Sequence, residues 1–493
     1  MNFSNSTTDK TESLKDTKSL DNRWESIKWT QVEKDVNRLQ TRIAKATANG
    51  DNNKAKRLQY LLTHSFSAKA FAVKKVTTNK GKNTSGVDKR LWSTSASKMK
   101  AVLSLTDTQY RAKPLKRVYI EKKGKNKKRP LGIPTMYDRA MQTLYALALE
   151  PIAETKADHI SFGFRRGRSA KDACEQIFCV LARKCSPAWV LEGDIKGCFD
   201  NINHEWLLSN IPMDKRIMKQ FLKSGYIFEG ELFPTKTGSP QGGAISSLYA
   251  NMTLDGIEKI IQDKYHRNSK GNIENHYRAK TKVNLVRYAD DFIITANTRE
   301  IAEELKGIVS KFLESRGLEL SEGKTTITHI DKGFDFLGWT FRKFKGKLIV
   351  KPSKSSIKSL IRKCSTIILK EGKASTQSEL IRRLNQVIRG WTNYQKHTVA
   401  SQTFSHINNT LYHLLTLWAK QRHPNKNKWW WLNKYWHEKD GKRWLFMTDD
   451  YTLINLRRIN IVRHPKLQIS KNPFLDMEYF YIRKIKLHVL VAA

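Results

Sequence analysis

The sequence has only five cysteines, and they are not arranged as close pairs. They are Cys174, Cys179, Cys185, Cys198 and Cys364. Because none stands in a Cys-x-x-Cys spacing, the sequence argues against a zinc site and against the disulfide framework of a small secreted protein. The pattern is typical of a protein in a reducing compartment.

Long apolar runs are also missing, and we expect no N-terminal signal peptide. No apolar run reaches the roughly 18 to 20 residues that a membrane-spanning helix needs. The N-terminus is rich in Ser, Thr and Asn, and its early acids argue against a mitochondrial transit peptide. We predict a disordered tail over residues 1–21, because this segment has few apolar residues to bury.

Acidic residues are scarce relative to basic ones. The chain has 90 Lys and Arg against 46 Asp and Glu in 493 residues, which gives a formal net charge of +44. Such a surface fits a polyanionic partner, and nucleic acid is the leading candidate. An anionic membrane surface is the weaker alternative. The length is sufficient for about two to four domains.

What the chain does have is a pair of adjacent carboxylates between two apolar segments. Asp290 and Asp291 stand between Val283–Val286 and Phe292–Thr295, a pattern typical of a β-hairpin with the acids at its tip. Two neighbouring acids repel each other, so the pair is destabilising unless a cation offsets it. Magnesium is the obvious cation, because it prefers carboxylate oxygens and keeps positions open for phosphates.

Phosphoryl transfer with two metal ions needs a further carboxylate from another strand. The apolar run Trp189–Leu191 leads to Asp194, and an Asp on a buried strand is destabilising without a partner such as a metal. Asp200 is the alternative ligand, but it lies in the following turn and is better placed to cap the next helix. We therefore predict one site from Asp194, Asp290 and Asp291.

Apolar periodicity divides the rest of the chain into strand-rich and helical parts. Helices are predicted over residues 54–71, 136–153 and 169–184, a β-hairpin over 115–134, a strand over 187–195 and short strands over 317–350. In the last third, three apolar stripes at helical spacing predict a three-helix bundle. One of these helices begins at Thr376, with Glu379 at capping-box spacing. His423 and His464 are predicted to be ordinary surface or backbone-bonded histidines.

Several motifs together resemble one protein family. Asp194–Asp200, Thr237–Gly243 and Tyr288–Asp291 occur in the order and rough spacing of reverse transcriptases. More narrowly, the chain resembles group II intron-encoded reverse transcriptase/maturases. The narrower resemblance rests on three further motifs, Arg129–Thr135, Gly163–Ser169 and Ile388–Tyr394. It covers residue 22 to the C-terminus, and as a set the motifs are highly specific.

The resemblance implies an α+β fold, a right-hand polymerase with fingers and palm around an antiparallel sheet. An α-helical thumb and a small basic C-terminal segment would follow. The expected domains are an RNA-binding N-terminal extension (22–95), fingers and palm (96–345), a thumb or maturase domain (346–425) and a basic, aromatic DNA-binding segment (426–493).

The resemblance also implies the roles of the site residues. Asp194, Asp290 and Asp291 would be the catalytic ligands of two Mg²⁺ ions, or Mn²⁺, and the backbone carbonyl of Ile195 would also face a metal. A primer 3′-hydroxyl would attack the α-phosphorus of a dNTP on an RNA template. Phe199 matches the family's aromatic gate, whose ring would clash with a ribose 2′-hydroxyl; a core phenylalanine is the alternative.

Four further residues are expected at the nucleotide. Arg129 would bind the triphosphate together with one of Lys122 to Lys128, of which we name Lys128; a solvated basic turn is the alternative. Gln241 lies in a turn that resembles the motif contacting the incoming nucleotide and the template. Lys324 resembles a palm lysine near the primer or nucleotide, and a plain surface lysine is a nearly equal interpretation.

The Gly163–Ser169 loop is predicted to contact nucleic acid through its arginines. Arg165, Arg166 and Arg168 would suit a template backbone, with a solvated charge cluster as an equal alternative. In the predicted thumb, Arg389 could meet RNA.

Aromatic residues of the last third fall into two groups. Trp391 and Tyr394 lie on an apolar stripe and are predicted to pack in the core. Trp429–Trp431 are adjacent and cannot all face one core, so at least one is expected to stack on a base or pack on a neighbouring loop. The contacts predicted for this segment are Lys426, Lys428 and Trp430.

The function implied is an RNA-directed DNA polymerase that binds its host intron RNA, assists splicing and supports retrohoming by target-primed reverse transcription. Expected partners are group II intron RNA, target and primer DNA and dNTPs, with no membrane; a monomer and a dimer in the ribonucleoprotein both remain open. The expected location is a bacterial cytoplasm, at the nucleoid, with an organelle matrix as the weaker alternative.

Two alternative functions and one departure from the family remain. The chain could be a stand-alone reverse transcriptase, for instance in phage defence, or a splicing cofactor that does not polymerise. Many family members carry an HNH endonuclease with cysteine pairs, and no cysteine follows Cys364. We therefore expect the endonuclease-lacking form, primed by a nascent DNA end at a replication fork.

Overall fold

A computed structural model describes residues 17–121, 128–240, 242–268, 270–272, 281–439 and 441–492. Most of the predicted tail lies outside these residues. Its described end, residues 17–21, is helical rather than disordered, because Leu20 packs against the main core and Asp21 Oδ1 accepts a hydrogen bond from Ala96 N at 2.5 Å.

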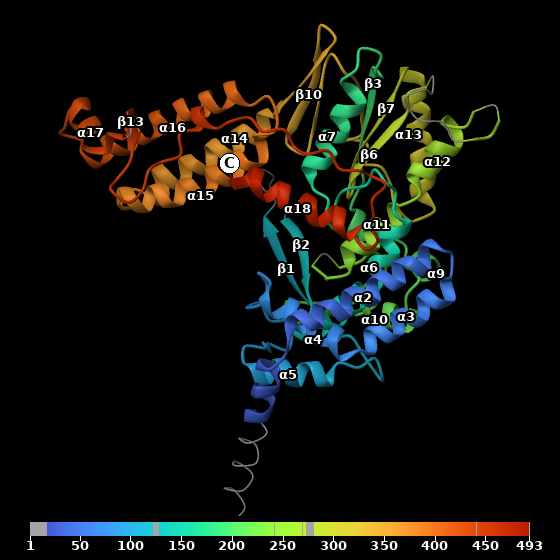
Figure 1. The fold of residues 1–493 in the computed structure, drawn as a ribbon. Coiled ribbons are helices and arrows are strands. Elements are labelled where there is room, and N and C mark those ends of the chain that lie inside the picture. Colours follow the sequence, from blue (N-terminus) through green and yellow to red (C-terminus); the bar gives the residue numbers. More distant parts are fainter. Residues whose placement is uncertain are drawn as a thin grey trace, which may run out of the picture.

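The N-terminal helices pack as one layer on a long helix of the fingers (Figure 1). They are α2 (Trp29–Ala48), α3 (Asn52–His64), α4 (Phe66–Thr78) and α5 (Ser95–Ser104), and the long helix is α6 (Met136–Lys156). Ile43 and Leu62 share a core with Leu144 of α6. The single helix predicted over residues 54–71 is two helices, because the Ser65 hydroxyl accepts a hydrogen bond from Ala68 N at 3.2 Å and caps α4.

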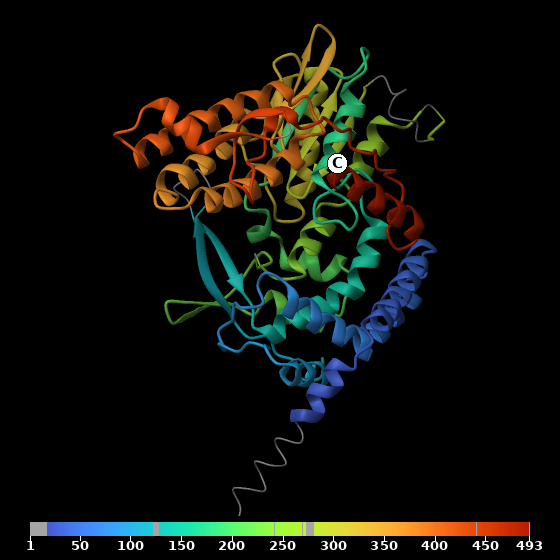
Figure 2. The same cartoon turned by 60° about the vertical axis from the view of Figure 1, so that its left-hand side comes forward.

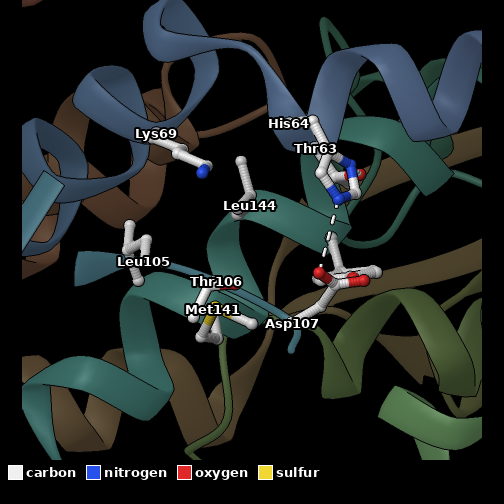
Figure 3. A pocket seen from close by; sticks show the side chains of 9 residues that line it. Thr63, His64, Lys69, Leu105, Thr106, Asp107, Met141 and Leu144 are labelled. Atoms are coloured by element: carbon white, nitrogen blue, oxygen red, sulfur yellow. Dashed lines mark hydrogen bonds and ion pairs between the residues drawn. The ribbon is translucent and has the colours of Figure 1, made fainter. Parts of the chain in front are cut away.

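An ion pair fastens this layer to the fingers (Figure 3). At the junction of α3 and α4, His64 faces Asp107 across a small cavity, with 3.3 Å between His64 Nε2 and Asp107 Oδ1. Asp107 also accepts a hydrogen bond at 3.1 Å from Arg216 of α10 (Lys215–Leu222). The N-terminal layer is therefore integrated into the fold.

The fingers contain a small sheet that includes the predicted hairpin. Its strands are β1 (Leu115–Glu121), β2 (Lys128–Ile133), β4 (Tyr226–Phe228) and β5 (Glu231–Phe233), in the order β2-β1-β4-β5. Strands β1 and β2 are antiparallel, whereas β1 and β4 run parallel. The β1–β2 hairpin extends from the N-terminal helices toward the thumb helices in both views (Figures 1 and 2).

The palm is built on an antiparallel sheet of order β6-β7-β3-β8. Its strands are β3 (Trp189–Asp194), β6 (Asn284–Tyr288), β7 (Asp291–Ala296) and β8 (Thr326–His329). Both faces of the palm sheet are buried at β3 and β7. The adjacent residues Val190 and Leu191, and likewise Ile293 and Ile294, point to opposite faces and have no exposed surface. The helices of the palm are α7 (Ala170–Leu181), α8 (Cys198–Asn201), α9 (His204–Asn210), α11 (Ser246–Leu254), α12 (Ile257–Tyr265) and α13 (Arg299–Glu314).

A second hairpin sheet connects the palm to a helical thumb. Its strands are β9 (Phe334–Phe336), β10 (Trp339–Phe344) and β11 (Lys347–Pro352). The thumb helices are α14 (Lys354–Ser365), which continues into a π-helical segment (Thr366–Glu371), α15 (Gln377–Gln395) and α16 (Ser401–Arg422). The predicted stripes meet in one core, and the Thr376 side chain caps α15 by accepting from Glu379 N at 3.3 Å.

The residues after 425 pack first on the thumb and then on the palm. Helix α17 (Lys428–Tyr435), strands β12 (Trp436–Lys439) and β13 (Lys442–Phe446) continue the thumb core. The chain then returns to the palm and ends in α18 (Met477–Ala492). The packing thus runs through the boundary predicted after residue 425, and the domain limits stay predictions.

The α+β class expected from the sequence is confirmed by these helices and largely antiparallel sheets. Within the described ranges, no helix combines the length and the apolar character needed to cross a membrane.

Candidate active site

The strand register brings the three predicted carboxylates together at one end of the palm sheet. Strands β6 and β7 form the predicted hairpin, with Tyr288 opposite Asp291 and a turn of Ala289 and Asp290. The neighbouring strand β3 pairs antiparallel with β7 and sets Asp194 directly opposite Asp291. Residues almost a hundred positions apart in the sequence therefore lie side by side.

Two glycines allow this turn to be packed tightly. An added Cβ at Gly163 would lie 2.4 Å from Ala289 N, and one at Gly193 would lie 2.1 Å from Phe292 Cζ. Ala289 itself has a φ of 57°, in the left-handed region that side chains rarely adopt. Arg287, which is fully buried, donates to the Ala289 carbonyl at 3.4 Å and pairs with Asp255.

The carboxylates perturb one another. Burial raises the pKa of Asp291 to about 6, with further contributions from Asp290 and Asp194, although the residue keeps some exposed surface. The pKa of Asp290 is also raised, by burial and then by Asp194, while Arg129 and Lys324 act in the opposite direction. A cation between these groups would therefore be bound favourably.

In this structure the cation on Asp194 is the ammonium group of Lys324. Lys324 Nζ lies 2.5 Å from Asp194 Oδ2, and Lys324 stands in a turn that is fixed by a 2.7 Å hydrogen bond from Ser321 N to Asp194 O. Among the described side chains, no three of His, Cys, Asp or Glu are already in position to hold a metal. The donor set nevertheless fits Mg²⁺, because all three side chains are carboxylates.

Ile195 and Phe199 follow Asp194 on the palm. Ile195 forms an antiparallel bridge with Leu320. This bridge uses backbone groups of Asp194 and Lys196, so the Ile195 carbonyl is not part of it. Phe199 is half-buried in α8, 6.3 Å from the ring of Phe164 and at the wall of a cavity of about 280 Å³ between the fingers sheet and the Thr237 loop.

The capping role that we predicted for Asp200 is wrong. Asn203 caps α9, since its side chain accepts hydrogen bonds from Glu205 N and Trp206 N at 2.7 and 3.1 Å. Asp200 lies inside α8 and is exposed.

The residues predicted at the triphosphate lie on strand β2. Arg129 and Lys128 are exposed there, and Arg129 is close enough to Asp290 to lower its pKa. The alternative lysines before Lys128, and Gln241, lie outside the described residues. Gly242, next to Gln241, packs so closely on β2 that an added Cβ would lie 2.6 Å from Gly132 O.

The three loop arginines are not equivalent. Arg165 is buried against Glu154, with 2.6 Å between Arg165 Nη2 and Glu154 Oε1, and the Arg168 guanidinium lies 3.5 Å from the same carboxyl. Their side chains are 5% and 1% exposed, so the structure gives them an internal role instead of the predicted template contact. Arg166 is exposed and stacks 5.1 Å from Phe474.

In α15 the two aromatic residues of the predicted apolar stripe are packed, and the arginine outside the stripe is exposed. Trp391 packs in the thumb core and donates to Ser356 Oγ at 3.0 Å. Tyr394 stacks on Trp339 at 4.5 Å, which confirms core packing for both aromatics, while Arg389 is exposed.

The Trp429–Trp431 run is split between core and surface. Trp431 is buried, and Trp429 is 66% exposed. Trp430, the ring that we predicted to contact nucleic acid, lies 4.7 Å from His423 with the Lys434 ammonium 4.8 Å from its centre. Lys426 and Lys428 are exposed.

The sequence interpretation missed a buried charge cluster near the C-terminus. His464, predicted to be a surface or backbone-bonded histidine, is buried with its Nε2 2.8 Å from Asp172 Oδ1, and Arg483 pairs with the same carboxylate. Asp172 also accepts from Ser169 in the capping box of α7. The only local pattern that could have indicated this cluster was the capping-box spacing of Ser169 and Asp172. The other two partners of Asp172, His464 and Arg483, come from almost three hundred residues or more further along the chain.

Three family models match the chain. They are "N-terminal domain of reverse transcriptase" at residues 24–105, "Reverse transcriptase (RNA-dependent DNA polymerase)" at 120–341 and "Group II intron, maturase-specific domain" at 357–436. The central model spans both the fingers sheet and the palm sheet that carries the three carboxylates.

Two bacterial relatives and one solved structure are similar to parts of the chain. The group II intron-encoded protein LtrA of Lactococcus lactis subsp. cremoris is 35% identical over 54% of this chain and 53% of its own length. Protein YkfC of Escherichia coli K12 is 30% identical over 62% of this chain and 87% of its own length. A telomerase from Candida albicans aligns with a TM-score of 0.35 and 13% identity over 67% of this chain and 64% of that one.

These matches show the family of the chain but not its activity. The aligned region spans about half the length of LtrA, and the TM-score of the telomerase is too low to support a conclusion. The reverse transcriptase and maturase models occur in one chain, in the order expected from the motifs. The chain belongs to the family of group II intron-encoded reverse transcriptase/maturases, with the α+β right-hand polymerase fold expected of it.

Proposed function

We propose that the protein is an RNA-directed DNA polymerase that binds its host group II intron RNA, assists splicing and copies the intron into DNA from a target-site primer. The observation that carries the polymerase part is the register that sets Asp194 opposite Asp291, with Asp290 in the adjoining turn. Carboxylates from two strands at one sheet edge are what phosphoryl transfer with divalent metals requires.

Asp194, Asp290, Asp291 and the Ile195 carbonyl would hold two Mg²⁺ ions, with Mn²⁺ as a substitute. When bound, these ions supply positive charge to the attacking and leaving oxygens of nucleotide transfer. The raised pKa values of Asp290 and Asp291 support this assignment, because mutual repulsion in the absence of a cation is their natural cause after burial. Lys324 would move off Asp194 as the site fills.

The cavity beside Phe199 is the proposed position of the nucleotide sugar. It lies between the fingers hairpin and the Thr237 loop, and Pro130 and Gly132 of β2 form one wall. Arg129 stands on the same strand but does not line the cavity. Arg129, with Lys128, would bind the triphosphate, and Gln241 would contact the base or template. The Phe199 ring at the cavity wall would leave no room for a 2′-hydroxyl, which favours deoxynucleotides.

The maturase part rests on the thumb and N-terminal layer. Exposed cations such as Arg389, Lys426 and Lys428 stand on or next to the segment matched by the maturase model, and the formal charge of +44 exceeds what one nucleotide site needs. The bacterial relatives support the further proposal that the protein works at the nucleoid in a bacterial cytoplasm, as a monomer or dimer in its ribonucleoprotein.

The proposed function is tested by sequencing the RNA that co-purifies with the full-length protein. We expect an RNA that folds with the catalytic hairpin domain of a group II intron and encloses the reading frame. The Asp290→Ala variant should retain this RNA and assist its splicing, but lose primer extension. Primer extension without any intron RNA would favour a stand-alone reverse transcriptase, and equal inactivity of wild type and variant would leave only the splicing cofactor.

A further inference from the structure

A groove away from the catalytic carboxylates runs between a helix near the start of the chain and the last helix. It has a volume of about 740 Å³ and lies between α2 and α18, over the turn formed by Gly167 and Arg168. Figure 2 shows α18 beside the N-terminal helices, although the two segments come from opposite ends of the sequence. The proposed polymerase chemistry leaves this groove without a role.

Helix α18 presents one face to the groove. Met477, Tyr481, Lys484 and His488 line it at spacings of three and four residues. The Tyr481 side chain is 67% exposed and has its ring available for contact. Phe480 forms part of the floor and covers Gly167, where an added Cβ would lie 2.6 Å from Phe480 Cδ1.

The wall formed by α18 is held rigidly. Arg483 is buried, pairs with Asp172 at the start of α7 and donates a 2.8 Å hydrogen bond to the Pro465 carbonyl. His464 binds the same carboxylate. A preformed wall reduces the ordering that a ligand must impose on binding.

The available charge in the groove is positive. Arg166 and Lys484 are exposed, and neither has a carboxylate of a described residue at ion-pair distance. Arg166 does act on the Glu150 carboxyl, whose pKa it lowers against the larger effect of burial. Asp172 is the one carboxylate among the described lining residues; it is already paired with Arg483 and in contact with His464. Glu478, the one acid of α18, does not line the groove.

We propose that this groove binds a single-stranded stretch of polynucleotide, with phosphates at Arg166 and Lys484 and a base stacked on Tyr481. Arginine and lysine that have no carboxylate at ion-pair distance attract phosphates, and an exposed aromatic ring adds base stacking. An acidic peptide would satisfy the two cations but has no planar base for the tyrosine. RNA and DNA strands share the chemistry that the groove recognises.

The groove is connected to the active site by one loop. Gly163 packs against the catalytic turn, and Phe164, which is 60% exposed, lies beside Phe199. A few residues later the same loop supplies Arg166 and Gly167 to the groove. The groove and the polymerase site therefore share one short loop, and this inference rests on the proposed function only in requiring a nucleic-acid partner.

The test places the photo-crosslinking residue p-benzoylphenylalanine at Tyr481 of the full-length protein, without dNTPs. We expect labelled single-stranded RNA or DNA to crosslink, and the arm that saturates at lower concentration identifies the strand. Ile485, an exposed residue of α18 outside the lining, is the control position and should not crosslink. The proposal is overturned if neither strand crosslinks, if a blunt duplex crosslinks equally well, or if polyglutamate of equal charge competes equally well.

A charge-matched pair of variants tests the phosphate contact in the same assay. Lys484→Glu, on the groove face, should raise the RNA or DNA concentration for half-maximal crosslinking about tenfold. Lys486→Glu makes the same charge change on the exposed side of the helix away from the groove and should change it less than twofold. Equal effects of the two variants would overturn the assigned contact.

Primer extension on the same preparations separates this inference from the polymerase proposal. Crosslinking by a protein that does not extend primers would leave the groove proposal standing and defeat the polymerase. Active primer extension without crosslinking at Tyr481 would leave the polymerase proposal standing and defeat the groove proposal.

Discussion

At the scale of single residues, Gly163 shows how closely the loop before α7 approaches the turn of Ala289 and Asp290. The Gly163 carbonyl accepts a hydrogen bond from Asn251 Nδ2 at 2.8 Å, which fixes the loop. The position of a Cβ would then be 2.4 Å from the backbone nitrogen of Ala289. A side chain here must displace the turn that carries Asp290.

We expect Gly163→Ala to reduce primer extension at least tenfold, because the added methyl group pushes Asp290 out of line with Asp194. Overpacking of this kind should lower the free energy of unfolding by about 1–3 kcal/mol. The control is Gly307→Ala in α13, where nothing lies within 4 Å of the new Cβ; it should be neutral or stabilising by up to about 1 kcal/mol. Full activity of Gly163→Ala would contradict the packing argument.

A second residue-scale prediction concerns His397. Burial lowers its pKa to about 3, with Lys171 and His464 acting in the same direction. The unfolded chain has the ordinary value near 6.5, so on acidification the unfolded state takes up a proton that the folded state does not. The free energy of unfolding should therefore fall by about 2 kcal/mol between pH 7.5 and 5 through this group.

Urea unfolding of His397→Leu at the two pH values measures this contribution. The variant should lose most of that pH dependence. His406→Leu, which changes an exposed histidine, should keep it. The same slope in both variants would show that His397 is not the group responsible.

The meeting of Asp194, Asp290 and Asp291 at one end of the palm sheet could be predicted from the sequence, but the position of their neighbour Lys324 could not. An apolar run that ends in an Asp is a local signal, and so is a pair of acids between two apolar runs. The contact of Lys324 with Asp194 depends on how a turn more than a hundred residues away folds back, which no local pattern encodes. For the same reason the burial of Arg165 and Arg168 against Glu154 was not predicted.

At the scale of elements, the C-terminal helix is fixed to the palm by one buried charge cluster. Asp172 is almost inaccessible, pairs with Arg483 and contacts His464. Removal of one partner from a buried ion pair leaves an uncompensated charge. The attachment of α18 therefore depends on Arg483 more than on its apolar residues, several of which are exposed.

Arg483→Met should lower the free energy of unfolding by about 3–5 kcal/mol, measured by urea unfolding of the full-length protein. Lys486→Met on the same helix changes an exposed cation and should stay within about 0.5 kcal/mol. A small effect of Arg483→Met would mean that the cluster does not hold α18.

The start of a helix was predictable where a capping residue precedes the apolar stripe. It was not predictable where a capping residue lies inside the stripe and divides it into two helices. Thr376 has its capping partner at the expected spacing, and α15 begins there. Ser65 divides a continuous helical stripe into α3 and α4, because a serine inside an apolar stripe can either face solvent or cap a new helix. The return of the chain from the thumb to the palm is set by Asp172, a partner about three hundred residues earlier.

At the scale of the whole molecule, the net charge of +44 is the property that the sequence predicts most directly. Binding to nucleic acid should release many counterions. We expect affinity for RNA to fall at least about a thousandfold between about 50 and 200 mM salt, as for proteins that neutralise roughly six or more phosphates. A nearly flat salt dependence in filter binding would contradict a surface built for a polyanion.

The central claim is that Asp194 and the Asp290–Asp291 turn form a polymerase site, and single-nucleotide primer extension on an RNA template tests it most directly. The matched pair is Asp194→Asn and Asp331→Asn, the same change on an acid opposite Asp291 and on an exposed acid in the turn after β8. We expect Asp194→Asn to lose at least about a thousandfold in rate, on the order of 4 kcal/mol of barrier, while Asp331→Asn stays within a few-fold of wild type. Equal activity of the two variants, or loss only in Asp331→Asn, would contradict the account.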